Sequence, residues 1–306
     1  MTDVPSLYEA AGATAEHVAK AELLTEMLPY IQRFAGQIVV IKYGGNAMID
    51  PALAKQFASD IVLLRQVGML PVVVHGGGPQ IGDMMKRLGK EAVFQDGLRV
   101  TDAETLDIAR MVLVGKVNRD IVSDINIHGP RAVGLSGQDA GIITAEARDP
   151  SLGFVGNVRH VNPMIITQLL SEGLIPVIAT IGADTTGQAY NINADTVAGA
   201  IAASLSAAKI VYLSDVPGLL SEVADPASLI NRITTPELRA MLDAGELDGG
   251  MIPKITACVD AVDEGVERAH LLDGRVPHVV LLEIFTNAGI GTMITHDPVV
   301  DGTGAS

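Results

Sequence analysis

Short unbroken runs of apolar residues recur along the chain, and segments with helical periodicity separate them. An unbroken apolar run is typical of a strand buried on both faces of a sheet, and strands that alternate with helices favour a parallel sheet. We therefore predict an α/β fold, a three-layer αβα sandwich with a mainly parallel central sheet. The predicted strands span residues 38–41, 70–75, 93–94, 98–100, 131–137, 142–147, 154–161, 174–180, 209–215, 269–273 and 278–285.

Boundary residues mark the predicted helices. Asp50 and Pro51 supply an N-cap and a first-turn proline, and Gly68 follows the end of that helix. Thr101 and Glu104 have the spacing of a capping box at the start of a long helix that runs to about residue 127. Further helices are predicted over residues 80–88 and 196–205, and in segments closed by Gly173, Gly245 and Gly265.

Residues 15–35 precede the first predicted strand. Apolar residues recur there at steps of three and four, which gives a helix one apolar face, and Pro29 should kink this helix or divide it in two. Two interpretations stay open: the helix docks on its own domain, or it is an arm that packs against another subunit. The apolar positions are Ala21, Leu24, Leu28, Ile31 and Ala35.

The first strand ends in candidate phosphate-binding residues. Lys42 stands at its carboxyl end, and Gly44 and Gly45 follow without side chains that would block a ligand. Ligands of open α/β sheets gather outside the carboxyl ends of the strands. A lysine beside two bare backbone N–H groups suits a phosphate, although a core strand that ends in a Gly-Gly turn has the same pattern.

The second strand leads into Gly76, Gly77 and Gly78 and then into a helix, whose amino terminus offers unpaired N–H groups to an anion. The loop is not a dinucleotide fingerprint, because Ile81 occupies the third glycine position, and the chain has no Walker A sequence. It also matches a lipase-type oxyanion loop, but the chain lacks the G-x-S-x-G elbow that this chemistry needs. A predicted hairpin around residues 95–97 brings Arg99 close to the glycine loops.

Two charged residues fall in the first turns of predicted helices. Asn193 is a natural N-cap, so Asp195 lies in the first turn, where it either complements the helix dipole or orients cations at a cleft. Lys254 lies in the first turn of a later helix, where a cation opposes the dipole. A residue placed against such a local preference indicates a function.

The chain has 306 residues and a formal net charge of −15, with 3% aromatic residues and no tryptophan. Nucleic-acid and anionic-membrane surfaces favour positive charge, and base stacking needs aromatic rings, so we expect neither partner. Cys258 is the only cysteine, which excludes an internal disulfide and a cysteine-based zinc site. We expect a reducing, cytoplasmic location, no signal peptide, no membrane-spanning run and no dedicated metal site.

Six motifs occur in order at residues 42–47 (KYGGNA), 74–80 (VHGGGPQ), 97–101 (GLRVT), 191–195 (NINAD), 213–218 (LSDVPG) and 250–254 (GMIPK). With them the chain resembles the amino acid kinase family from about residue 37 onward, and within it the N-acetylglutamate kinases rather than the aspartate, carbamate, glutamate 5- or UMP kinases. The resemblance implies the carbamate kinase-like fold. It also implies ATP-dependent phosphorylation of the side-chain carboxylate of N-acetyl-L-glutamate in arginine biosynthesis, with Mg²⁺ carried by ATP.

The resemblance further implies roles for individual residues. Lys42 and Lys254 would stabilise charge on the transferring phosphoryl group, with Asp195 holding both lysines. The substrate carboxylate is already ionised at neutral pH, so the reaction depends on positioning and charge stabilisation rather than on a general base. The implied nucleotide-binding residues are Gly44, Gly45, Ser214 and Asp215, and the implied acyl amino acid-binding residues are Gly77, Gly78, Arg99 and Asn191.

The amino-terminal helix and the Glu-x-Phe-Thr-x-x-Gly-x-Gly-Thr stretch at residues 283–292 resemble the arginine-inhibited form of this family. This implies a homohexamer, a trimer of dimers joined by the helices. The implied domains are an oligomerisation arm (1–36), an N-lobe for acyl amino acid binding and dimerisation (37–206), and a C-lobe for ATP and arginine (207–306). The implied contacts of L-arginine are Lys209, His270, Glu283 and Gly289.

Two alternatives stay open at this point. Another acyl-phosphate-forming kinase of the same fold would use Arg99 and Asn191 to bind a different acid. A catalytically silent arginine sensor or scaffold is the alternative from a different class. The presence of Lys42, Lys254 and Asp195 argues against a sensor, because a sensor needs no phosphoryl clamp.

Overall fold

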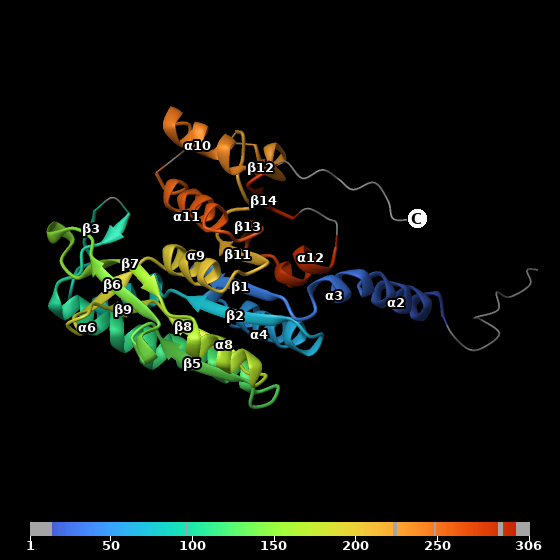
Figure 1. Cartoon of the computed structure of the whole chain (residues 1–306), viewed down its shortest axis with the longest axis horizontal. Coiled ribbons are helices and arrows are strands. Elements are labelled where there is room, and N and C mark those ends of the chain that lie inside the picture. The colour runs from blue at the N-terminus through green and yellow to red at the C-terminus, as the bar shows by residue number, and fades with distance from the viewer. Residues whose placement is uncertain (1–13, 96, 223–224, 248, 287–289, 298–306) are drawn as a thin grey trace, which may run out of the picture.

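An eight-stranded sheet forms the centre of the computed structural model, which describes residues 14–95, 97–222, 225–247, 249–286 and 290–297 (Figure 1). In spatial order its strands are β12 (Arg232–Thr234), β14 (Thr292–Thr295), β13 (Ala269–Asp273), β11 (Lys209–Ser214), β1 (Ile38–Tyr43), β2 (Leu70–His75), β8 (Ile175–Ala179) and β5 (Ala132–Ser136). The strands from β13 to β5 run parallel, whereas β14 and β12 run in the opposite direction. The predicted mainly parallel sheet is confirmed.

The central strands are buried on both faces, as their unbroken apolar runs predict. Residues 39–41 of β1 are fully buried. In register, Lys42 of β1 lies beside Val74 of β2 on one side and Tyr212 of β11 on the other. The loops that follow these neighbouring strands therefore lie side by side at the carboxyl edge of the sheet.

Helices cover both faces of the sheet and give the molecule two hydrophobic cores. The helices and helical turns nearest the sheet are η1 (Gly45–Met48), α4 (Pro51–Gln66), α5 (Gly78–Arg87), α6 (Ala103–Arg110), η2 (Met111–Val117), α7 (Asn118–Asn126), α8 (Met164–Ser171), α9 (Ala194–Ser204), α10 (Thr235–Ala244), α11 (Ile252–Asp263) and α12 (Val279–Phe285). Val39 and Ile41 belong to the core that also contains side chains of α4, α5, α6, α7 and α12. Val40 belongs to the core with side chains of α8, α9 and α11. The predicted three-layer sandwich is therefore confirmed.

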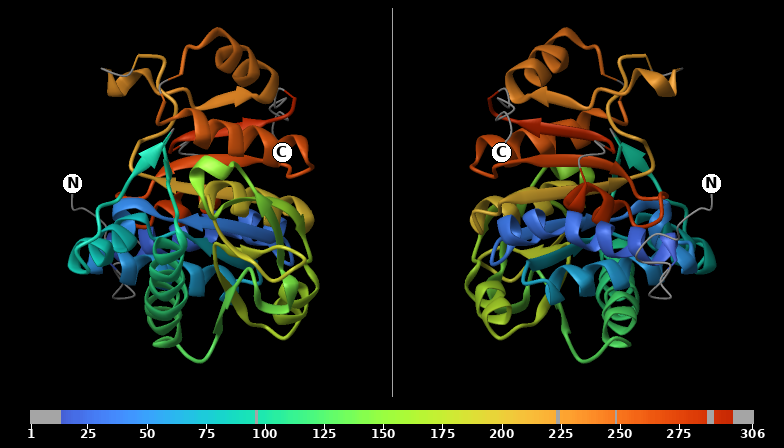
Figure 2. Two further views of the ribbon diagram at one scale, coloured as in Figure 1. Left: turned by 90° about the vertical axis from the view of Figure 1, so that its left-hand side faces the viewer. Right: turned by 90° about the vertical axis from the view of Figure 1, so that its right-hand side faces the viewer.

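A small closed sheet stands beside the central one. It consists of β10 (Ala189–Ile192), β7 (Val155–Val161), β6 (Ile143–Ala147) and β9 (Ile181–Ala183). The two partly exposed strands predicted near residues 142–147 and 154–161 are present in it as β6 and β7. A hairpin of β3 (Phe94–Gln95) and β4 (Leu98–Arg99) also forms where predicted, and it projects from the body above the long α6–η2–α7 helix (Figures 1 and 2).

The amino-terminal segment forms two helices, α2 (Ala15–Glu26) and α3 (Leu28–Phe34), which meet at Met27. Pro29 lies in the first turn of α3, so the predicted break is confirmed. No residue of α2 is buried, and Leu24 on its apolar face is 68% exposed. Helix α3 contacts the body through buried Phe34, whereas α2 extends away from it (Figure 1). The apolar face of α2 is therefore not covered by its own domain.

Residues 279–285 form helix α12, so the predicted strand at 278–285 is wrong. A short apolar run has the same composition in a buried helix and in a buried strand, and periodicity alone does not separate them. Here α12 follows His278, a residue with the left-handed φ of 58°, and it packs against α4. The His278 Nδ1 atom lies 2.6 Å from Asp60 Oδ1 of α4 and fixes this packing.

The capping box predicted at Thr101 and Glu104 is also wrong. The N-cap of α6 is Asp102, whose carboxylate accepts a hydrogen bond from the backbone N–H of Thr105 at 2.8 Å. Glu104 pairs instead with Lys90, at 2.6 Å. The Thr101 hydroxyl donates to the carbonyl of Arg99 at 2.7 Å, so Thr101 supports the hairpin rather than the helix.

In the described parts of the chain, no helix has both the length and the apolar character needed to cross a membrane.

Replacing Asp50 tests the start of α4, because its Oδ1 atom accepts hydrogen bonds from the N–H groups of Ala52 (2.7 Å) and Leu53 (3.2 Å). We expect Asp50→Ala to lower the free energy of unfolding by about 1 kcal/mol in urea denaturation. Asp50→Asn is the matched control, since an amide oxygen also caps a helix, and its loss should be much smaller. Equal losses in the two variants would contradict the role of the cap.

Candidate active site

Four segments supply most of the lining of a cavity of about 230 Å³ at the carboxyl edge of the sheet. They are the loop after β1, the loop after β2, the β3–β4 hairpin and the junction of β10 and α9. Parallel strands end on the same edge, which brings together segments that are far apart in the sequence. Its lining includes Lys42, Gly44, Gly45, Gly77, Gly78, Arg99, Asn191 and Asp195, all singled out from the sequence.

One carboxylate joins two ammonium groups at the wall of this cavity. Lys42 Nζ lies 2.9 Å from Asp195 Oδ1, and Lys254 Nζ lies 3.4 Å from Asp195 Oδ2. Lys42 comes from β1, Asp195 from the first turn of α9 and Lys254 from the first turn of α11. Asn193 is the N-cap of α9, as predicted, and its Oδ1 atom accepts a hydrogen bond from the N–H of Asp195 at 2.8 Å.

Asp195 is buried and ionised. Burial by itself raises the pKa of its carboxyl group, but the charges and hydrogen bonds of Lys42 and Lys254 outweigh burial and hold the pKa below its ordinary value. A carboxylate with a lower pKa in the folded than in the unfolded protein stabilises the fold at neutral pH. That contribution begins to be lost as the pH falls below ~4 and is gone below the folded pKa. The side chain of Lys254 is 29% exposed and that of Lys42 only 9%, so Lys254 is the more accessible ammonium group.

The two glycines after Lys42 are fixed by close neighbours. A Cβ atom at Gly44 would lie 2.8 Å from Lys42 Nζ, which folds back over this position. Gly45 has a φ of +69°, and a Cβ atom there would lie 2.6 Å from a carboxylate oxygen of Asp215. The backbone is therefore bare directly beside an ammonium group, which suits a phosphate.

Arg99 lies next to the second glycine loop, as the predicted hairpin requires. Its guanidinium group donates to the carbonyl of Gly78 at 3.0 Å and lies 4.7 Å from the centre of the Phe94 ring. Burial lowers its pKa, which is no obstacle to charge at pH 7 in an arginine. Asn191 of β10 lies on the same cavity, and its amide nitrogen is 3.4 Å from the Thr101 hydroxyl.

Ser214 and Asp215 follow β11, the strand that neighbours β1. Ser214 is buried, and its hydroxyl oxygen has no hydrogen-bond partner among the described residues. Neither residue lines the cavity of about 230 Å³ itself; both belong to the adjacent strand end, with Asp215 against Gly45. Lys254 is also absent from the lining and reaches the cavity only through its contact with Asp195.

A second charged cluster lies at the opposite, amino edge of the sheet. Glu283 Oε1 of α12 lies 3.2 Å from Lys209 Nζ and 2.8 Å from His270 Nδ1. Burial lowers the pKa of His270 to about 4, so its ring is neutral at pH 7. Burial raises the pKa of Glu283, but its contacts with His270 and Lys209 outweigh burial and lower the pKa. The fourth predicted member, Gly289, lies outside the described residues.

The ammonium group of Lys209 also lies 5.2 Å from the centre of the Phe34 ring of α3. The amino-edge cluster (Lys209, His270 and Glu283) is therefore in contact with the amino-terminal helices.

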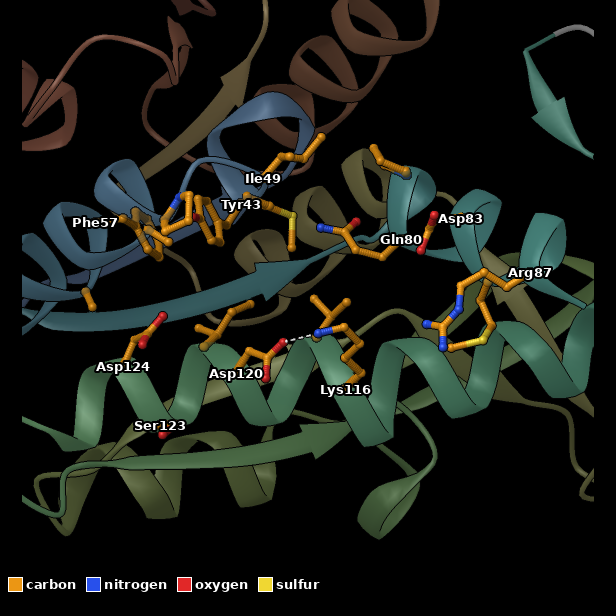
Figure 3. Close-up of a pocket in the computed structure, with 18 residues that line it drawn as sticks. Tyr43, Ile49, Phe57, Gln80, Asp83, Arg87, Lys116, Asp120, Ser123 and Asp124 are labelled. Atoms are coloured by element: carbon orange, nitrogen blue, oxygen red, sulfur yellow. Dashed lines mark hydrogen bonds and ion pairs between the residues drawn. The ribbon is translucent and has the colours of Figure 1, made fainter.

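A larger cavity, of about 680 Å³, lies between α4, α5 and the η2–α7 part of the long helix (Figure 3). On one wall Tyr43 and Phe57 stack with ring centres 3.8 Å apart, and on another Lys116 pairs with Asp120 at 2.8 Å (Figure 3). Its lining includes neither the Lys42–Asp195–Lys254 cluster nor Arg99. We therefore assign the candidate active site to the smaller cavity.

Several further residues of the smaller cavity were not predicted as site residues, among them Thr180 and Leu113. Thr180 follows β8 and lines the cavity with the other strand ends, and the rule that parallel strands end at one edge would have found it. Leu113 lies in η2, a π-helical segment, and packs against Gly77. Its position depends on tertiary packing, for which the sequence carries no signal. Within the described ranges, no group of three or more His, Cys, Asp and Glu side chains is placed to hold a metal ion.

The sequence matches the family described as "Amino acid kinase family" over residues 37–273. The acetylglutamate kinase of Pelotomaculum thermopropionicum is 51% identical over 287 residues, and the alignment covers 90% of this chain and 97% of that protein.

Solved structures with the same fold include the N-acetylglutamate synthase from Neisseria gonorrhoeae in complex with coenzyme A and N-acetyl-glutamate. The TM-score is 0.80 at 26% identity over 91% of this chain, which spans 64% of the synthase. The same synthase in complex with coenzyme A and L-arginine gives a TM-score of 0.76 at 24% identity, over 90% of this chain and 65% of the synthase. Carbamate kinase from Giardia lamblia bound to AMP-PNP shares the fold, with a TM-score of 0.66 at 18% identity over 86% of this chain and 100% of that one.

Replacing Asp195 by Asn preserves the shape of the side chain and removes its charge, so the two ammonium groups face each other without a counter-ion. We expect the free energy of unfolding to fall by about 3 kcal/mol at low ionic strength. Inorganic phosphate should raise the Tm of Asp195→Asn more than that of the unmodified protein, because it binds the freed lysines. Asp120→Asn is the control, since its exposed pair with Lys116 contributes about 0.5 kcal/mol or less. Equal phosphate shifts in all three proteins would contradict the assignment.

Proposed function

Because the chain belongs to the amino acid kinase family, and within it to the acetylglutamate kinases, we propose that it phosphorylates the side-chain carboxylate of N-acetyl-L-glutamate with ATP. The chain is a kinase, and the resemblance found in its six motifs is confirmed. The proposal is supported most directly by two ammonium groups that share Asp195 beside the cavity that Arg99 also lines. Three cations around one small cavity suit a reaction between two anions.

In the proposed reaction, a carboxylate oxygen of N-acetyl-L-glutamate attacks the γ-phosphorus of ATP. A bond forms between that oxygen and the phosphorus, and the bond from the phosphorus to the β–γ bridging oxygen breaks. ADP leaves with the electron pair, and the product is N-acetyl-L-glutamyl 5-phosphate. No proton has to be removed, so catalysis consists of bringing two anions together and stabilising the charge on the transferring group.

We assign Lys42 and Lys254 to the transferring phosphoryl group and Asp195 to holding both lysines. Their ammonium groups lie on the two oxygens of one carboxylate, so they are oriented before a ligand arrives. Groups that are already in place need little reorganisation during the reaction. Lys42 is buried, so its interaction with a phosphoryl group is less screened than it would be at the surface.

The nucleotide is assigned to the side of the cavity next to β11. Gly44 and Gly45 bring bare backbone to the phosphates beside Lys42. Ser214 and Asp215 complete this side, and the buried Ser214 hydroxyl has hydrogen-bonding capacity left for a ligand. Mg²⁺ enters as its complex with ATP, whose phosphates supply ligands to the metal.

The acyl amino acid is assigned to the side of the cavity next to the hairpin. Arg99 offers a planar guanidinium group to the carboxylate that does not react, and Asn191 offers an amide to the polar groups of the substrate. Gly77 and Gly78 offer backbone N–H groups at the start of α5, where the helix dipole favours an anion.

This assignment divides the chain into the three functional units expected from the sequence. We assign residues 1–36 to oligomerisation, residues 37–206 to binding of the acyl amino acid and to dimerisation, and residues 207–306 to binding of ATP and arginine. A homohexamer, a trimer of dimers, would cover the apolar face of α2 that its own domain leaves exposed. We place the enzyme in the cytoplasm, where a lone buried thiol such as Cys258 stays reduced.

We further propose that L-arginine inhibits the enzyme by binding at the amino-edge cluster. Glu283 is a carboxylate suited to a guanidinium or α-amino group, and Lys209 suits the α-carboxylate. The cluster touches α3 through Phe34, so a ligand there would act on the amino-terminal arm as well as on α12. A synthase of the same fold has been solved in complex with L-arginine.

Replacing the two active-site lysines tests the proposed reaction. Acyl phosphate formed from ATP and N-acetyl-L-glutamate is trapped with hydroxylamine. We expect Lys42→Ala and Lys254→Ala each to lower kcat by about 100- to 1,000-fold, because each removes a preorganised positive charge. Lys116→Ala is the control, since Lys116 lies in the larger cavity and should leave kcat nearly unchanged.

Two outcomes would contradict this proposal in different ways. Full activity of Lys42→Ala or Lys254→Ala would refute the assignment of the phosphoryl-transfer residues. The folded, unmodified enzyme could also turn over glutamate, aspartate or carbamate and form no acyl phosphate from N-acetyl-L-glutamate. That result would refute the proposed substrate.

Replacing Glu283 by Gln tests the arginine site. We expect the concentration of L-arginine needed for half-maximal inhibition to rise by about tenfold or more, because a charged hydrogen bond becomes a neutral one. Glu172→Gln, at the exposed C-cap of α8 and far from the amino-terminal arm in the sequence, is the control and should not change that concentration. An enzyme that L-arginine does not inhibit would remove the regulatory proposal and leave the kinase proposal standing.

A further inference from the structure

Two fully buried polar side chains, His75 and Asn118, lie behind the loop of residues 76–78. His75 ends β2, and its Nδ1 atom is 2.9 Å from the carbonyl oxygen of Gly76. The Asn118 amide nitrogen is 3.0 Å from His75 Nε2. This pair therefore connects the long helix to the first peptide group of the loop to which we assigned the acyl amino acid.

The contacts determine which nitrogen of His75 carries the proton. Burial lowers the pKa of His75 to about 4, so the ring is neutral at pH 7. The amide nitrogen of Asn118 only donates, so His75 Nε2 has to accept. The proton is therefore on Nδ1, which donates to the Gly76 carbonyl and orients the peptide group between Gly76 and Gly77.

Asn118 is itself held from three sides. Its amide nitrogen also lies 2.9 Å from the carbonyl of Val177 in β8 and 3.2 Å from the carbonyl of Leu135 in β5. Its amide oxygen accepts from the guanidinium group of Arg119. These neighbours leave one orientation of the amide, the one in which its nitrogen faces His75.

The side chains of Asn118 and Arg119 occupy space against β5 that only a glycine in that strand leaves open. A Cβ atom at Gly134 would lie 1.9 Å from Asn118 Oδ1 and 1.9 Å from a guanidinium nitrogen of Arg119. Glycine weakens a strand interior, so its presence in the middle of β5 marks a close approach of other groups.

Asn118 also follows directly on η2, the π-helical segment of the long helix. A Cβ atom at Gly77 would lie 2.6 Å from the side chain of Leu113 and 3.3 Å from that of Val117, both in this segment. One stretch of helix thus supplies both the apolar packing and the polar contact that shape the loop. Single π-helical turns inside α-helices occur frequently at functional sites.

We propose that Asn118 is a positioning residue for the acyl amino acid site. Through His75 it fixes the 76–77 peptide group, so that the loop presents its backbone N–H groups to the substrate in one geometry. This inference rests on the proposed function, since it assumes that the loop binds N-acetyl-L-glutamate. It does not involve the nucleotide side of the cavity, so the effects on the two substrates should differ.

The experiment compares Asn118→Ala with Asn126→Ala. Asn126 lies on the same helix and accepts hydrogen bonds from the backbone N–H groups of Arg131 and Ala132, so its loss destabilises without reaching the loop. We expect Asn118→Ala to raise the KM for N-acetyl-L-glutamate about tenfold and to change the KM for ATP by less than about twofold. Asn126→Ala should lower the Tm and leave both KM values unchanged.

His75→Asn supplies a second comparison, because the amide nitrogen of Asn reaches nearly the same place as Nδ1. It should preserve the KM for N-acetyl-L-glutamate better than His75→Leu does. The double variant His75→Leu/Asn118→Ala provides a third comparison. Its fold-increase in the KM for N-acetyl-L-glutamate should be smaller than the product of the fold-increases of the two single variants, because the two residues act through one contact.

Nitrogen-15 NMR of the His75 ring tests the link without turnover. The unmodified protein should show a neutral ring protonated on Nδ1, and Asn118→Ala should show a mixture of the two tautomers. An unchanged tautomer, or a KM for N-acetyl-L-glutamate equal to that of the unmodified enzyme, would overturn the inference. Should the unmodified enzyme not phosphorylate N-acetyl-L-glutamate, the proposed function fails, whereas the tautomer measurement still decides whether Asn118 fixes His75.

Discussion

The rest of the site depends on one carboxylate that lies between two ammonium groups. Asp195 holds Lys42 and Lys254 on its two oxygens, and the three residues come from β1, α9 and α11. Two lysines this close would repel each other, so the carboxylate is a condition for having both at the cavity. The arrangement also requires the Asn193 cap, because it fixes the turn from which Asp195 projects. The position of the whole of α9 is in this way tied to the electrostatics of the cavity.

Much of the site could be predicted because a parallel sheet collects its functional residues at one edge. The buried runs at residues 38–41 and 70–75, together with the glycines that follow them, are enough to indicate that edge. The cap at Asn193 located Asp195, and the unfavourable placement of Lys254 in a first turn singled out a residue that the structure brings to Asp195. These are local signals, since each depends on residues within a few positions in the sequence.

What the sequence did not predict depends on contacts between distant segments. The apolar run that ends at residue 285 forms a helix that packs against α4, where His278 contacts Asp60, 218 residues away in the sequence. The short strands β9 and β10 have no strong alternation or run of apolar residues that would predict a strand. They close a sheet with β6 and β7, and that pairing is a contact between distant segments. Thr101 and Asp102 both suit an N-cap, and the hairpin that bonds Thr101 decides between them. The contact between His75 and Asn118 behind the 76–78 loop could not be predicted for the same reason, since the two residues are 43 positions apart in the sequence.

The exposed helix α2 has a consequence for stability if, as proposed, copies of the chain associate through it. A single copy leaves Leu23 and Leu24 of α2 57% and 68% exposed, and covering the exposed part of each contributes roughly 1–2 kcal/mol. Any such association removes folded monomer from the equilibrium with unfolded chain and raises the apparent stability. If copies associate through α2 as proposed, the free energy of unfolding becomes a function of protein concentration, and dilution would then act as a mild denaturant.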